Sequence, residues 1–278
     1  MSRRRLLPSL LLVASALLGA LESHAEERFI TLATVSAAEN SGLLDHLLPR
    51  FTERTGISVR VLAVGSGQAQ RLARNGDADA LLLNDQGAES ALVDEGHAGA
   101  RHAVMYNDFV IVGPEGDPAA IRKAETADEA LARIAELEAG FISAGDGGGA
   151  HRKELALWTA AGIDPRQASG AWYRDSGLGG GAALHAANDL SAYSLVDRAS
   201  WTAFANRAGL ALLFDRDPAL FNQYGLVLVN ARQHPHVKAV EAQTFAIWLT
   251  SAEGQEAIAD FRLEGQQLFF PNARRPDS

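Results

Sequence analysis

The sequence predicts an α/β fold of two lobes, each a mainly parallel sheet flanked by helices. Three observations support this class. Short apolar runs alternate with helical patterns from residue 29 onward, the alternation restarts after Pro114, and a strand of the first type returns late, at 224–230. Alternating strands and helices are typical of βα units. A chain that crosses twice between its lobes predicts a hinged clamshell, which can close on a small solute.

The first lobe is expected to contain residues 26–111 and 226–278. Leucines and a phenylalanine recur at helical spacing over 41–51, and Gly56 follows at a position that ends helices. Residues 57–64 alternate between apolar and polar side chains, which is typical of a strand. The elements expected up to the first crossing are strands at 29–33, 57–64, 80–83 and 110–114, and helices at 41–51 and 65–73.

The second lobe is expected to be an insertion over residues 112–225. Its predicted elements are helices at 127–138, 151–161 and 182–190, with strands at 141–143 and 171–173. A strand at 224–230 and helices at 237–249 and 252–261 then complete the first lobe. The charged segments with proline or glycine at 114–118 and 215–217 are the candidate crossovers.

The N-terminus predicts export through a signal peptide at residues 1–25. Three arginines at 3–5 precede an apolar run over 6–21, and Ser23 and Ala25 provide the small residues that a signal peptidase reads. A retained membrane anchor is the alternative, but the run is short for a span. We therefore expect cleavage after Ala25 and a periplasmic protein.

Composition limits the possible partners. The formal charge is −9, and the signal carries three arginines and one glutamate, so the mature chain is two units more negative, near −11. Such a charge argues against nucleic acid and against anionic membrane surfaces. The chain has no cysteine, so a packed core rather than disulfides must stabilise the exported protein.

No pattern indicates catalysis, a metal or a cofactor. The sequence has no His-Glu-x-x-His or Gly-x-Ser-x-Gly motif and no Cys- or His-based metal spacing. The glycine run at 177–182 superficially fits a dinucleotide fingerprint, but it lies deep in the chain without a suitable buried strand before it. We expect a binding protein and not an enzyme.

The glycine-rich stretch at 141–151 has the local pattern of an anion cradle. An apolar strand leads into a run of glycines that opens a helix, and N–H groups at a helix start favour negative charge. The stretch contains no lysine or arginine, and Ser143 is its only hydroxyl. An anion there would depend mainly on backbone donors.

Several motifs together carry a family resemblance. They are Glu-Asn-Ser-Gly at 39–42, Gly-Ser-Gly-Gln-Ala at 65–69, Asn-Gly-Asp-Ala-Asp at 75–79, the segments 104–114, 151–158 and 161–165, Asp-Phe at 260–261, and Gly-Gln-Gln-Leu-Phe-Phe-Pro at 265–271. In this order they resemble the periplasmic tungstate-binding proteins of ABC importers, over 29–271. The resemblance implies a type II solute-binding clamshell, an oxyanion or small-molecule ligand, a membrane permease as partner, and a monomer.

Four loops contact the oxyanion in that family, and this chain keeps only part of their chemistry. The resemblance transfers a ligand-binding role to Thr34, Ser36, Ser66, Ser143, Gly148, Gly149 and Gly181. At other contact positions the family's hydroxyls are replaced by Val35, Ala37, Ala38, Ala150 and Ala183, and its arginine is replaced by Ala144. The scaffold is retained, whereas the usual donors for tungstate are reduced.

Other interpretations stay open at this stage. Ser36 and Ser66 could cap helices instead of binding a ligand, Asp146 is expected to cap the helix it precedes, and His151 more often has a structural role. Arg152, Lys153 and Arg174 are possible sources of positive charge. A paralogue that binds another small solute, and an accessory or sensor protein that contacts a partner, are the two alternatives for function.

Overall fold

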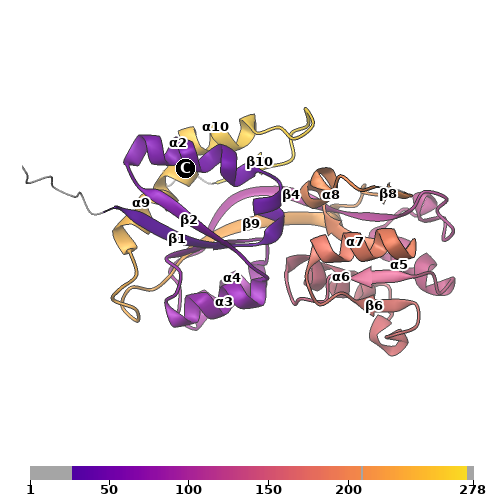
Figure 1. Cartoon of the computed structure of the whole chain (residues 1–278). Coiled ribbons are helices and arrows are strands. Elements are labelled where there is room, and N and C mark those ends of the chain that lie inside the picture. The colour runs from indigo at the N-terminus through magenta and orange to yellow at the C-terminus, as the bar shows by residue number, and fades with distance from the viewer. Residues whose placement is uncertain (1–26, 208, 274–278) are drawn as a thin grey trace, which may run out of the picture.

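The computed structural model describes residues 27–207 and 209–273, which form two lobes joined by two long strands (Figure 1). The signal peptide predicted at 1–25 lies outside the described residues. Among the helices that the model describes, none has the length and apolar character needed to span a membrane.

Lobe 1 is built on a sheet with the strand order β10-β4-β9-β3-β1-β2. Strand β1 (Phe29–Thr34) pairs in parallel with β2 (Ser58–Ala63) and with β3 (Ala80–Leu83). The other pairs are antiparallel and involve β9 (Phe221–Leu228), β4 (His102–Pro114) and β10 (Phe270–Pro271). The sheet is therefore mixed rather than mainly parallel, because β9, which returns from the second lobe, runs antiparallel to both β3 and β4.

The helices of lobe 1 follow its strands and cover the sheet. They are α1 (Ser36–Asn40), α2 (Leu43–Thr55), α3 (Ser66–Asn75), α4 (Gln86–Asp94), α9 (Ala239–Thr250) and α10 (Ala252–Asp260). Helix α2 buries Leu43, Leu44, Leu47 and Phe51, the side chains whose spacing predicted it. Phe51 packs edge-on against Phe245 of α9, so both ends of the chain contribute to one core.

Lobe 2 is built around the second half of β4, which pairs antiparallel with β7 (Ser194–Asp197) and β8 (Leu210–Phe214). Strands β5 (Phe141–Ser143) and β6 (Tyr173–Asp175) pair in parallel. Its helices are α5 (Ala127–Glu136), α6 (Gly149–Ala160), α7 (Gly180–Leu190) and α8 (Arg198–Ala203), with short 3-10 turns at Ile121–Lys123, Pro165–Ala168 and Pro218–Leu220. Two apolar clusters form the core of this lobe.

The first crossing between the lobes lies inside a continuous strand. Asp108 of β4 pairs with Phe221 of lobe 1, and the next residue, Phe109, pairs with Asp197 of lobe 2. The proline-bearing turn at 114–118 lies at the far end of β4, beyond the crossing. The expected lobe boundaries at 111/112 and 225/226 stay a prediction, and the change of strand partners occurs a few residues earlier in β4.

Candidate functional site

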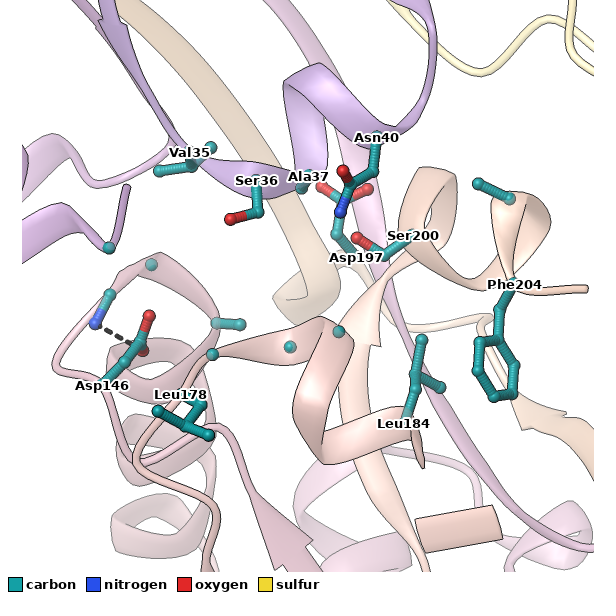
Figure 2. Close-up of a pocket in the computed structure, with 18 of the residues that line it drawn as sticks. Val35, Ser36, Ala37, Asn40, Asp146, Leu178, Leu184, Asp197, Ser200 and Phe204 are labelled. Atoms are coloured by element: carbon teal, nitrogen blue, oxygen red, sulfur yellow. Dashed lines mark hydrogen bonds between the residues drawn. The ribbon is translucent and has the colours of Figure 1, made fainter. Parts of the chain in front are cut away.

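A cavity of about 600 Å³ lies where the two lobes face each other (Figure 2). Loops after β1, β2 and β3 contribute from lobe 1, and loops after β5, β6 and β7 contribute from lobe 2. Its lining includes Ser36, Ala37, Gly65, Ser66, Asn84, Asp146, Gly148, Gly149, Ala150, Gly179, Gly181 and Asp197. The cleft is thus assembled from segments far apart in the sequence.

Three of the helices that begin at this cavity have a glycine at the N-cap position. Gly65, Gly148 and Gly179 are the N-cap residues of α3, α6 and α7, and no side chain caps any of the three. The first N–H groups of a helix have no partner inside the helix. Three uncapped N-termini at one cavity therefore provide backbone donors and a favourable field for an anion.

Ser66 adds a side-chain donor from lobe 1. It is the first residue of α3 and is 1% exposed, and its Oγ has no hydrogen-bond partner among the described residues. A buried hydroxyl without a partner is costly. Because Ser66 lines the cavity and caps no helix, its hydroxyl is available to a ligand.

The structure brings together five of the seven residues expected to bind ligand. Ser36, Ser66, Gly148, Gly149 and Gly181 line the cavity. Ser36 is exposed and does not cap α1, which leaves its hydroxyl free of a capping role.

The other two expected residues, Thr34 and Ser143, are outside the lining. Both are fully buried, and their hydroxyls are used within the protein. Thr34 Oγ1 donates to the carbonyl of Leu82 at 2.8 Å, and Ser143 Oγ donates to Glu154 at 2.7 Å. Their hydroxyls tie β1 to β3 and β5 to α6, so the structure places them in the supporting framework of the loops.

The substituted positions also divide between cavity and core. Val35, Ala37 and Ala150 line the cavity. In contrast, Ala38, Ala144 and Ala183 are at most 1% exposed and lie outside the lining. Only the first three positions could present an added side chain directly to the cavity.

The described lining residues include no lysine and no arginine, but they include the carboxylates of Asp146 and Asp197. The three candidate cations lie outside the lining and donate hydrogen bonds to backbone carbonyls. Arg152 Nε donates to the carbonyl of Gly147 at 3.0 Å. Lys153 Nζ donates to the carbonyl of Ala219 at 2.6 Å, and Arg174 Nε donates to the carbonyl of Ala171 at 3.3 Å. Burial lowers the pKa of Lys153. The groups of the described lining that favour an anion are therefore helix N-termini, beside the imidazole of His185.

The glycine loop before α6 is held by its own polar side chains. Asp146 Oδ1 accepts from the N–H of Gly148, and His151 Nδ1 accepts from the N–H of Gly147, both at 2.9 Å. His151 thus has the structural role favoured from the sequence. Asp146 bonds the N-cap residue of α6, as expected for a residue that stabilises a helix entry.

A polar network at the base of the cavity was not anticipated from the sequence. Asp197 accepts from Asn107 at 2.9 Å and from Asn222 and Tyr224 at 2.7 Å. Asn107 belongs to β4, whereas Asn222 and Tyr224 belong to β9, the two strands that join the lobes. Burial raises the pKa of Asp197, and these hydrogen bonds oppose that effect.

The lobes touch along one rim of the cavity. A Cβ atom placed on Gly149 of lobe 2 would lie 2.3 Å from the carbonyl oxygen of Asn84 in lobe 1, so this position has no room for a side chain. Beside it, Arg152 Nε lies 2.9 Å from Oδ2 of Asp85. Burial raises the pKa of Asp85, and the Ala88 N–H and the Arg152 charge oppose that effect.

Comparisons with known proteins agree with this architecture. A family model described as a PBP superfamily domain matches residues 21–253. The chain is 40% identical over 261 residues to the tungstate-binding protein TupA of Peptoclostridium acidaminophilum, covering 92% of this chain and 90% of that protein. It is 33% identical over 242 residues to TupA of Campylobacter jejuni, covering 86% and 89%.

The crystal structure of the tungstate ABC transporter from Geobacter sulfurreducens is 42% identical in sequence and superposes with a TM-score of 0.78, covering 84% of this chain and 99% of that one. These likenesses confirm the expected two-lobed α/β fold of a type II solute-binding protein.

Proposed function

We propose that this chain, which belongs to the PBP superfamily, is the solute-binding component of an ABC importer and takes a small oxyanion in the cleft between its lobes. The convergence of three uncapped helix N-termini on one cavity is the observation that carries this proposal. The relatives named as tungstate-binding proteins support the ligand class.

Binding would use donors from both lobes. Backbone N–H groups at the starts of α6 and α7 come from lobe 2, and the Ser36 and Ser66 hydroxyls come from lobe 1. A hydrogen bond to a charged group contributes about 1.5–3 kcal/mol, so a few such donors are sufficient for useful affinity. Because the donors belong to different lobes, an anion between them favours the closed arrangement.

Transport would follow from that closure. Strands β4 and β9 join the lobes, so rotation about them opens and closes the cleft. A permease in the inner membrane would dock the closed form. We propose that the protein acts as a monomer, has no catalytic activity and binds no nucleic acid; the absence of catalytic motifs and the negative charge support this view.

The protein would act in the periplasm after cleavage of its leader. The arginines at 3–5 and the small residues Ser23 and Ala25 support cleavage after Ala25. Intact mass of protein from the periplasmic fraction tests this proposal. A mass that still includes residues 1–25 would contradict it.

The ligand class is tested with mature protein, residues 26–278, in a thermal-shift screen followed by calorimetry. The probes are tungstate, molybdate, sulfate, phosphate and arsenate, with neutral sugars and amino acids as comparisons. We expect at least one oxyanion to raise the melting temperature by mass action. Ser66→Ala should weaken that binding by about tenfold or more, because it removes a buried donor.

The proposal fails if no oxyanion binds and a neutral solute does. It also fails if Ser66→Ala binds oxyanions as tightly as the wild type while retaining its fold. A matched control is Ser58→Ala, which removes a hydroxyl from a partly buried position on β2 outside the cavity lining. Anion affinity of this control should equal that of the wild type.

A further inference from the structure

The cavity between the lobes is much larger than an inorganic oxyanion. It measures about 600 Å³, whereas a tetrahedral oxyanion has roughly the bulk of two or three water molecules of about 30 Å³ each. The lobes already touch at the rim, where Gly149 lies against the carbonyl oxygen of Asn84. The volume is therefore not that of a widely open cleft, and it falls in the range of cavities that hold small organic ligands, about 300–1,000 Å³.

Helix α7 leads from the anion end of this cavity to a second end. Its N-cap residue Gly179 and its second residue Gly181 line the cavity. A Cβ atom on Gly180 or Gly181 would meet nothing within 4 Å, so the space over the first turn is open. His185 also lines the cavity, four residues after Gly181. It therefore lies on the same face of the helix, about 6 Å farther along the axis.

The second end of the cavity is apolar and aromatic. The ring of Phe204 meets that of His185 edge-on, with centroids 5.0 Å apart. The apolar residues that complete this part of the lining are Leu184, Ala203 and Ala205. Leu184 and Phe204 belong to an apolar cluster of lobe 2, so the cavity opens here onto a core. In Figure 2 these two side chains lie on the opposite side of the view from Asp146, which marks the glycine loop before α6.

This second end offers little to a charged ligand. Ser200 and Asn206, the polar lining residues of the same segment, carry no charge. Asp197 is 3% exposed and already accepts hydrogen bonds from its neighbours. An inorganic oxyanion at the helix starts would leave the apolar surface at His185 and Phe204 in water, whereas a ligand that covers this surface gains affinity from its burial.

We propose that the cleft takes an organic anion, whose oxyanion headgroup binds at the helix N-termini and whose apolar group packs at the His185–Phe204 end. The headgroup accepts from the helix N–H groups and from Ser66, whose hydroxyl is buried and has no partner among the described residues. A single six-membered ring attached to the headgroup fits a separation of about 6 Å along α7. This inference rests on the proposed function, because it concerns the ligand of the same cleft.

Calorimetry at neutral pH on the mature protein tests the inference with two pairs of ligands. Methanesulfonate is compared with benzenesulfonate, and acetate with benzoate, so each pair shares a headgroup and a charge and differs in its apolar group. In at least one pair the phenyl member should bind at least about tenfold more tightly, because it buries the apolar end. It should also bind more tightly than sulfate, phosphate, molybdate and tungstate.

His185→Ala removes one wall of the apolar end at an exposed position of α7. It should lower the preference for the phenyl member of the pair by about fivefold or more. Because both members carry the same charge, their affinity ratio is insensitive to any charge lost with the imidazole. His236→Ala is the matched control, since His236 is exposed and lies outside the cavity lining. It should leave the ratio unchanged.

Two results would overturn the inference and leave the proposed function standing. One is equal affinity within both ligand pairs, and the other is tighter binding of an inorganic oxyanion than of either phenyl anion. An unchanged ratio in His185→Ala, or an equal fall in both variants, would also overturn the assignment of the apolar end.

Other results would contradict the proposed function itself. Benzyl alcohol has the ring without the charge, and it should bind far more weakly than the phenyl anions. If it binds as tightly as they do and no anion binds more tightly, the cleft is not an anion site. Absence of binding for every anion would have the same meaning. The ligand series with the wild type decides these questions without any variant.

Discussion

Asn222 donates from Nδ2 to Asp197 Oδ2 at 2.7 Å. This hydrogen bond links β9, one of the strands that connect the two lobes, to the base of the binding cavity. Asn222 Nδ2 also lies 2.7 Å from Asn107 Oδ1, and Asn107 donates in turn to Asp197. The three side chains thus connect β9, β4 and β7. The geometry of the crossing is set by one buried carboxylate that also faces the cavity.

We expect Asp197→Asn to destabilise the protein. Four donors point at this carboxylate, from Asn107, Asn222, Tyr224 and the backbone of Ala199. An amide offers one acceptor oxygen, and its NH₂ group would face the donors to the other oxygen. The cost should be about 1–3 kcal/mol for each buried group left unpaired, measured as the free energy of unfolding in urea.

Asp215→Asn is the control for Asp197→Asn. Asp215 pairs with Arg198 near the same crossing but is 39% exposed, and Arg198 keeps its second partner, Asp108. This control should cost less than about 1 kcal/mol. Equal losses for the two variants would show that the Asp197 network has no special role.

Gly149→Ala should impair closure of the lobes without unfolding either one. The new methyl group would meet the carbonyl of Asn84 across the rim, and a backbone oxygen cannot move aside cheaply. We expect anion affinity to fall by about tenfold or more, with little change in melting temperature without ligand. Small-angle scattering should show a smaller decrease in radius of gyration on adding anion.

Gly116→Ala provides the matched control for Gly149→Ala. Gly116 lies in the turn after β4, outside the cavity lining, and a Cβ atom there would meet nothing within 4 Å. Affinity and closure should match the wild type. If Gly149→Ala also closes normally, the contact with Asn84 does not limit closure.

Added hydroxyls at lining positions should strengthen oxyanion binding. Ala37→Ser with Ala150→Thr places one donor on each lobe, and each could contribute about 1.5–3 kcal/mol to a charged ligand. Calorimetry should show a gain of about tenfold or more. Ala38→Ser is the control: Ala38 is fully buried in the core of lobe 1, so its added hydroxyl should lower stability without raising affinity.

Stability should fall as pH rises through the titration of Glu154. Burial raises its pKa from 4.5 to about 7 in the folded protein, although Ser143, Tyr173 and Trp158 donate to it. Between these pH values the folded lobe holds a proton that the unfolded chain has released. The stabilisation is therefore complete below the lower value and lost above the higher one, with a size of up to about 3 kcal/mol.

Glu154→Gln has no proton to lose and should flatten this dependence. Urea unfolding on both sides of the window compares the two proteins. Glu129→Gln is the control, because Glu129 lies on α5 in an ion pair with Arg133 and its pKa is lowered. If wild type and Glu154→Gln lose stability equally as pH rises, Glu154 is not the group that titrates.

The sequence determined the elements whose cause is local. The apolar run at 80–83 and the helical spacing in α2 define those elements, because a strand buried on both faces is continuously apolar and a helix buried on one face is apolar at a fixed period. Weakly patterned segments were missed, including α4, which contains Gly87, and β7, whose Ser194 and Asp197 leave only two apolar residues between them. Such segments form because tertiary neighbours cover them.

Only the tertiary structure decided which strands pair and which polar groups face the cavity. The partner change within β4 depends on strands more than 80 residues away, as in the pairing of Phe109 with Asp197, and no local pattern encodes it. The sequence identified the loops of the site through glycines and serines. It could not distinguish Ser66, whose hydroxyl has no partner, from Ser143, whose hydroxyl bonds the buried Glu154, because hydrogen-bond partners are set by three-dimensional packing.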